Sequence, residues 1–175
     1  MNFDSPHTEH SGHVEHHAHG ESRNTRREAR ELALRMLFQI ELGKQPISEV
    51  LDAALAQSQL EGANRAYAEE LVRGTLTHKK ELDERLSALT TDWASDRQAT
   101  VDRNLLRLAS YELLYRPDAP IAAVVNEAVE LAKKYSTAES GRFVNGVLGA
   151  LARQPRAAAQ TVASAASHRE EPGGG

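Results

Sequence analysis

The sequence contains no cysteine, and its 175 residues include only one tryptophan, three phenylalanines and four tyrosines. The lack of cysteine excludes disulfide bonds, thiolate nucleophiles and cysteine-ligated zinc. No apolar run reaches the length of about 20 residues that a membrane-spanning helix needs, and the N-terminus lacks the basic and apolar regions of a secretory signal. We therefore expect a cytoplasmic protein with no membrane association, whose hydrophobic core is mainly aliphatic.

The motifs of common enzymes and cofactor sites are missing as well. There is no glycine-rich phosphate loop, no GxSxG motif and no HExxH motif. Neighbouring carboxylates such as Glu69 and Glu70 point in different directions on a helix, so we interpret them as solvated faces. His78, the only histidine of the central region, is expected to satisfy carbonyl groups at a helix end. The sequence thus predicts no enzyme activity, no catalytic or metal site and no cofactor.

The two ends of the chain differ from the middle in composition. Residues 1–22 hold six of the eight histidines, and residues 154–175 are rich in alanine and close with Pro-Gly-Gly-Gly. Such segments cannot bury a core, so we predict two disordered tails, and the irregular histidine spacing argues against a metal site. From Ser22 to Arg153 basic and acidic residues are equal in number, nineteen of each. Residues 23–153 are therefore expected to form one neutral domain.

Apolar residues in this domain recur at the spacing of α-helices, and no segment alternates with a period of two. Thr25 and Glu28 match a capping box that opens a first helix, Gly43 closes it, and Ser136 with Glu139 matches a capping box before the last helix. The apolar stripes predict an all-α fold of seven helices, with stripes at 29–40, 47–55, 68–76, 82–89, 100–115, 121–135 and 144–151.

The helix at 100–115 is apolar on most sides, which is typical of a central helix packed against several others. Arg107 and Glu112 lie within it, and we expect both to form ion pairs because an unpaired charge is costly inside a core. Gly74 lowers the helix propensity of the third stripe, which indicates a point where another helix comes close.

A basic cluster opens the first helix and contains Arg23, Arg26, Arg27, Arg30 and Arg35. The commoner role of such a cluster is a solvated helix face with local ion pairs, and the alternative is a clamp for an RNA backbone. Phe38 and Phe143 lie beside buried stripes. They could cap the edge of the core or provide platforms on which unpaired RNA bases stack.

Three stretches of the domain resemble the NusB family of transcription antitermination factors. They are RREARELALRMLFQIEL at 26–42, LLRLASYELLYRPDAP at 105–120 and VNEAVELAKKYSTAESGRFVNGVLGAL at 125–151. The resemblance implies two packed three-helix-type bundles, seven helices in all. It further implies a factor that binds boxA-type single-stranded RNA together with the ribosomal protein NusE, joins the transcription elongation complex and supports processive transcription of ribosomal RNA operons.

The resemblance also implies roles for individual residues. Its RNA-binding positions fall on the first and last helices, at Arg26, Arg27, Arg30, Phe38, Glu139, Arg142 and Phe143. Its acidic partner-binding position falls on Asp102, with Arg103 beside it. Glu28 stands where the family often has a third basic residue, so we expect reduced RNA affinity.

The predicted helices are also compatible with other functions. One is the amino-terminal domain of ribosomal RNA cytosine methyltransferases, or a stand-alone relative of it; with 22 residues after Arg153 and no cysteine, we expect no catalytic domain. Another is a helical scaffold that binds only protein, which the neutral charge permits. An apolar surface available to NusE could also support a homodimer.

Overall fold

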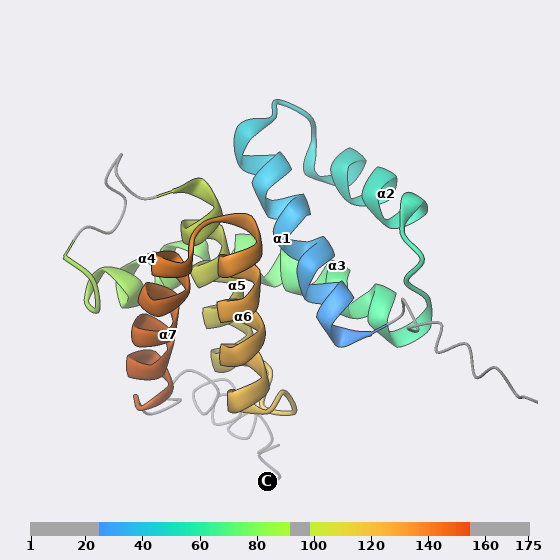
Figure 1. The fold of residues 1–175 in the computed structure, drawn as a ribbon. Helices are drawn as coiled ribbons and strands as arrows, with labels where there is room; N and C mark the ends of the chain where they lie inside the picture. The colour runs from blue at the N-terminus through green and yellow to red at the C-terminus, as the bar shows by residue number, and fades with distance from the viewer. Residues whose placement is uncertain (1–24, 92–98, 155–175) are drawn as a thin grey trace, which may run out of the picture.

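The computed structural model describes residues 25–91 and 99–154, and within these ranges the chain forms seven α-helices and no strand (Figure 1). The helices are α1 (Arg26–Leu42), α2 (Ile47–Gln57), α3 (Gly62–Thr77), α4 (Lys79–Ser87), α5 (Thr100–Tyr115), α6 (Ile121–Tyr135) and α7 (Ala138–Ala152). The predicted all-α fold is thus confirmed. The tails predicted at 1–22 and 154–175 lie outside the described residues, except for Gln154.

The first helix begins where its capping box was predicted. The Thr25 hydroxyl accepts the Glu28 backbone N–H at 3.3 Å, and the Glu28 carboxylate accepts the Thr25 backbone N–H at 2.9 Å. The last helix begins one residue later than predicted. Thr137, not Ser136, caps α7, because its hydroxyl accepts the Ser140 backbone N–H at 3.0 Å. Glu139 is left exposed in the first turn.

Two groups of helices meet at α5, which contacts α1 and α3 on one side and α4, α6 and α7 on the other. Helices α1, α2 and α3 pack together, and α6 and α7 lie side by side against α5 (Figure 1). These are the two expected bundles, and their buried side chains form one continuous, mainly aliphatic core. None of the described helices is long and apolar enough to cross a membrane.

Arg107 and Glu112 of α5 are both paired across helices, as expected. Arg107 donates two hydrogen bonds to Asp83 of α4 at 2.6 and 3.0 Å, and Glu112 accepts from Arg30 of α1. The close approach predicted at Gly74 is also present. A Cβ at this position would lie 2.0 Å from Cζ of Tyr111, so the Tyr111 ring of α5 occupies the space that a side chain would need.

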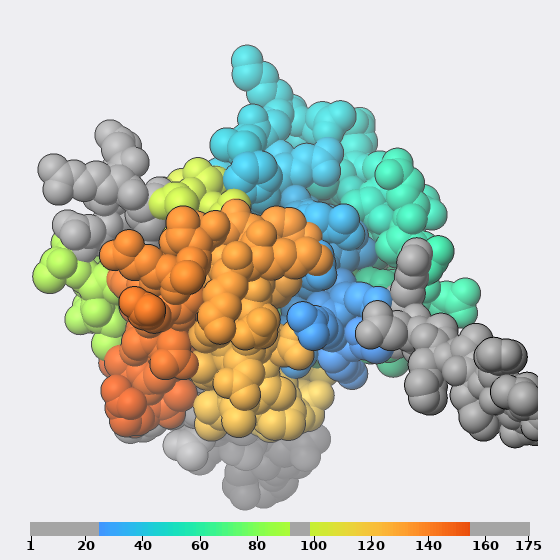
Figure 2. Space-filling model, viewed as in Figure 1, coloured from blue at the N-terminus to red at the C-terminus, as the bar shows by residue number. Residues whose placement is uncertain are grey.

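Helix α1 runs in the same direction as α6 and lies between α6 and α2 (Figures 1 and 2). Arg27 contacts Glu127, and Glu31, one turn further along α1, contacts Lys134, two turns further along α6. Tyr135 and Ile121, which were assigned to the buried stripe of α6, are 38% and 42% exposed at its two ends. This arrangement puts α1, the end of α6 and the start of α7 on one face.

Candidate nucleic-acid interface

The end of α6 is fastened to α1 through Glu31. The Lys134 ammonium lies 2.6 Å from one carboxylate oxygen of Glu31, and the Tyr135 hydroxyl donates a hydrogen bond to the same oxygen. Partial burial opposes ionisation of Glu31, but these hydrogen bonds and the charges of Lys134 and Arg35 outweigh it and lower the carboxyl's pKa. The Lys134 ammonium also lies 5.3 Å from the centre of the Tyr135 ring.

The first turn of α7 lies directly against the end of α6. Gly141 is buried there, and a Cβ at its position would lie 3.0 Å from Cγ of Lys133, so a small residue allows the two helices to approach. Glu139, Arg142 and Phe143 project from this turn into solvent, and Phe143 is 40% exposed. No ion pair engages Arg142 within the part of the chain that the structure describes.

The arginines at the start of α1 do not share one environment. The Arg27 side chain is 61% exposed, and its Nε lies 3.6 Å from a Glu127 oxygen. Arg26 is also exposed, but its guanidinium sits 3.8 Å above the ring of Tyr67 in α3. Phe38 is half-buried further along the helix. Of these three predicted contacts, Arg27 is therefore the most freely available to a ligand.

Arg30 differs from its prediction, because it was expected on the surface and is only 8% exposed. Its Nη2 and Nε atoms donate to the Glu112 carboxylate at 2.7 and 2.9 Å, and the Tyr67 hydroxyl donates to the same carboxylate. Its place on the helix explains the difference, since Arg30 follows the buried Ala29 on the inward side of α1. Arg30 thus links α1 to α5.

Asp102 also differs from the expectation of a partner-facing carboxylate. It is only 7% exposed, and its Oδ2 accepts the Ser140 hydroxyl of α7 at 2.7 Å. Its Oδ1 is buried without a hydrogen bond from the described residues. Arg103 beside it is 17% exposed and binds Glu41 at the end of α1. Both predicted partner-binding residues are therefore engaged in contacts between helices.

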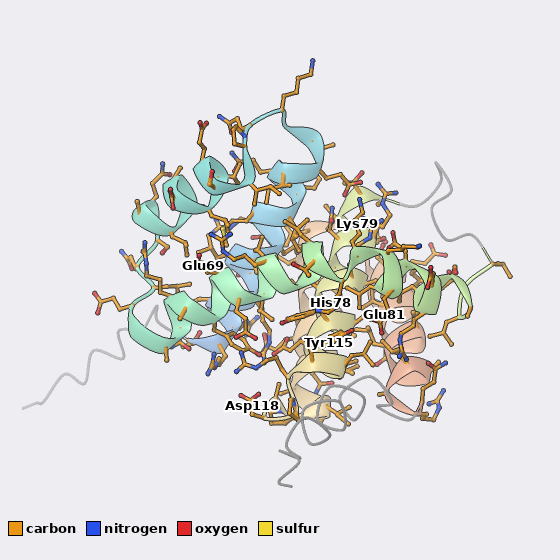
Figure 3. The ribbon with its side chains drawn as sticks, turned by 180° about the vertical axis from the view of Figure 1, so that it is seen from behind. Glu69, His78, Lys79, Glu81, Tyr115 and Asp118 are labelled. Carbon is orange, nitrogen blue, oxygen red and sulfur yellow. The ribbon has the colours of Figure 1, made fainter. Side chains whose placement is uncertain are left out.

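The side chain of His78 was expected to satisfy carbonyl groups, but it donates no hydrogen bond to a carbonyl of the described residues. Its ring stacks on Tyr115 at a centroid distance of 4.1 Å, and its Nδ1 lies 3.8 Å from Glu81 (Figure 3). The pKa of Tyr115 is raised to about 12. Burial is the larger cause, and the hydrogen bond that the Tyr115 hydroxyl donates to Glu81 adds to it. Glu70, expected to be solvated, accepts a hydrogen bond from Arg116. These contacts are structural.

Sequence reasoning missed the contribution of α6 to this face. Between the predicted groups on α1 and α7 lie Lys133, Lys134 and Tyr135. The run KKY at the end of a predicted helix was the sequence signal that could have indicated their role. Glu31 and Glu139 also lie on this face. Glu127 and Glu130 border it and pair with Arg27 and Lys133, so four carboxylates balance its four cations. We define the α1–α6–α7 face as Arg27, Glu31, Lys133, Lys134, Tyr135, Glu139, Arg142 and Phe143.

Comparison with known proteins identifies the family. The model of the NusB family matches residues 27–153. The chain belongs to the NusB family. The transcription antitermination protein NusB of Desulfitobacterium hafniense is 47% identical over 126 residues, which cover 71% of this chain and 85% of that protein. The NusB of Anaeromyxobacter dehalogenans is 47% identical over 132 residues, covering 75% and 91%.

Solved structures of NusB proteins have the same fold. The T. maritima NusB structure is 34% identical and superimposes with a TM-score of 0.70, over 75% of this chain and 93% of that one. A crystal structure of the antitermination factors NusB and NusE in complex with double-stranded RNA contains a chain that is 29% identical, with a TM-score of 0.66 over 73% and 96%. The resemblance inferred from the sequence is thus confirmed for the family and the fold.

Proposed function

We propose that this chain is a transcription antitermination factor that binds boxA-type single-stranded RNA together with NusE, as part of the transcription elongation complex on ribosomal RNA operons. The observation that carries the proposal is the α1–α6–α7 face, where exposed cations and aromatic rings from three helices lie together. The similarity to NusB relatives, one of them solved with NusE and RNA, supports the same function.

The chemistry of the face suits an unpaired RNA strand. Arg27, Lys133 and Arg142 can contact phosphates, since their charged groups are exposed and only weakly paired or unpaired within the described residues. The rings of Tyr135 and Phe143 can stack on bases, which contributes about 1 to 3 kcal/mol for each base. The acidic residues of the face weaken its positive field. We therefore expect low RNA affinity for the protein by itself.

In this proposal NusE contributes further contacts to the RNA, which raise the affinity. Arg103 and Glu41 form a part-exposed ion pair where α1 ends and α5 begins, and this end of the molecule is the proposed site for the partner. Asp102 acts there by holding α7 against α5 rather than by touching the partner. The relatives are antitermination proteins, and we propose no enzymatic role.

The experiment that tests the proposal is a titration of boxA-like single-stranded RNA, with and without NusE, at two salt concentrations. We expect weak, salt-sensitive binding by the protein and tighter binding by the heterodimer. Binding of NusE with no effect of RNA in any condition would instead show a scaffold that binds only protein. Sedimentation of the protein without NusE would show whether it forms a homodimer.

A further inference from the structure

A groove runs between α1 and α2, beside the α1–α6–α7 face. It encloses about 340 Å³, which is within the range of pockets that hold small ligands. Its floor includes the buried side chains of Leu32 and Met36, and Ala53 on α2 forms part of the opposite wall. The groove therefore has a volume that suits one base of a nucleotide, and an apolar surface on which that base can lie.

The polar groups of the groove are suited to an anionic ligand with hydrogen-bonding edges. Arg35 lines it, is exposed and has no ion-pair partner among the described residues. Gln39 and Gln57 line it from the two helices, and the Gln39 amide also donates a hydrogen bond to the Gln45 side chain at 3.3 Å. Glutamine amides can bind base edges with a donor and an acceptor together. None of the described residues that line the groove is acidic, although the whole chain has a net charge of −4.

Arg35 also connects the groove to the α1–α6–α7 face. Arg35 follows Glu31 by one turn of α1, and its charge acts on Glu31 and on Tyr135 at the corner where α6 meets α1. A strand that stacks on Tyr135 can therefore pass Arg35 with its phosphate and reach the groove with its next base. Figures 1 and 2 show α1 between the α6–α7 hairpin and α2, which is the order that this path requires.

We propose that the α1–α2 groove binds one unpaired base of the RNA strand that the α1–α6–α7 face holds, with the phosphate at Arg35 and the base edge at Gln39 and Gln57. The inference rests on the proposed function and adds a nucleotide site on α2 to it. Positive charge beside an apolar floor favours a nucleotide over an apolar peptide helix, and none of the described residues that line the groove carries a carboxylate.

The test combines variants of the groove with shortened RNA. The probe is a labelled single-stranded RNA of about 12 nucleotides, shortened one nucleotide at a time and titrated in the presence of NusE. Ala53→Phe fills the groove and Gln57→Leu removes one amide. Ala56→Phe, on an exposed part of α2 that does not line the groove, is the matched control. Thermal unfolding of each variant confirms that the fold is unchanged.

We expect Ala53→Phe and Gln57→Leu to weaken binding at least about fivefold, which corresponds to about 1 kcal/mol, and Ala56→Phe to have no effect. Removal of one particular terminal nucleotide should weaken binding to the wild type but not to Ala53→Phe, because the filled groove can no longer hold that base.

Other results would overturn the inference in recognisable ways. If Arg142→Ala weakens RNA binding while both groove variants bind like the wild type, the groove proposal fails and the proposed function stands. If the groove variants lose NusE affinity and keep RNA affinity, the groove is a protein-binding surface. If the wild type binds no RNA with or without NusE, both proposals fail.

Discussion

Arg30 of α1 and Glu112 of α5 form a buried ion pair through two guanidinium nitrogens, with Nη2 2.7 Å and Nε 2.9 Å from carboxylate oxygens. Glu112 is 1% exposed and also accepts the Tyr67 hydroxyl of α3. Three helices are therefore joined at one carboxylate. Arg27, one turn earlier on α1, points to the surface. The basic cluster of α1 thus divides between a structural arginine and exposed ones.

Arg30→Ala should lower the free energy of unfolding by about 3 to 5 kcal/mol, because it leaves a buried charge at Glu112 without its partner. Arg27→Ala should change it by less than about 1 kcal/mol, since the Arg27 pair is exposed. Urea unfolding of both variants measures the difference. Replacing the pair together, with Arg30→Met and Glu112→Leu, should recover much of the loss. Equal stability of the two single variants would contradict a structural role for Arg30.

Gly74→Ala should destabilise the protein by about 1 to 3 kcal/mol, because the new methyl group would overlap the Tyr111 ring. Gly146→Ala on α7 is the matched control, since no neighbouring atom lies within 4 Å of its Cβ position. Alanine favours a helix, so the control should be stabilised by about 0.5 to 1 kcal/mol. Thermal melting compares the two. A Gly74→Ala variant as stable as the control would show that Tyr111 can move aside.

Ser140→Ala should cost about 1 to 3 kcal/mol, since it leaves the buried Asp102 carboxylate without its only hydrogen bond from the described residues. It should also weaken RNA binding, because Ser140 holds the turn that carries Arg142 and Phe143. Asp102→Asn keeps an oxygen acceptor for the Ser140 hydroxyl and should affect both properties less. Denaturation and RNA titration of both variants measure this. Loss of NusE affinity with stability and RNA affinity intact would place Asp102 at the partner surface instead.

The stability of the contact between α1 and α6 should depend on pH through Glu31. Its pKa in the folded protein lies below the ordinary value of 4.5, so its ionised form stabilises the fold above that value. This contribution is lost as the pH falls through the lowered pKa. Unfolding free energy measured from roughly pH 6 to 3 should therefore decrease below pH 4.5, and less steeply in Glu31→Gln. If the free energy of unfolding fell equally steeply with pH in both proteins, Glu31 would not be a source of the pH dependence.

The seven helices could be predicted because their signals are local. The Thr25–Glu28 capping box and the apolar stripe of α5 depend only on residues close in sequence or on helix periodicity. The glycine inside α3 is a local signal too, although the Tyr111 ring that crowds it belongs to α5. The error of one residue at α7 arose because Ser136 and Thr137 are both good caps. Either could start the helix; in the structure the Thr137 hydroxyl accepts the Ser140 backbone N–H, and the Ser140 hydroxyl binds Asp102.

The site could be predicted only in part, because exposure depends on packing between distant segments. The pairing of Arg107 and Glu112 was expected, but which arginine of α1 turns inward depends on Glu112, 82 residues away. Asp102 is buried by α7, and nothing near it in sequence indicates this contact. Lys134 and Tyr135 became part of the site because α6 ends beside Glu31.

The central claim is that the α1–α6–α7 face holds RNA through exposed cations. The most direct test is the salt dependence of RNA affinity, measured in the presence of NusE, for the wild type and for Arg27→Ala combined with Arg142→Ala. Arg73→Ala is the control, because the Arg73 side chain is 55% exposed, against 61% for Arg27, but pairs with Glu69 on α3. Each lost phosphate contact should flatten the slope of log K against log salt by about 0.7. The account predicts a flatter slope for the double variant and an unchanged slope for the control. Tight RNA binding with the same slope in all three proteins would contradict it.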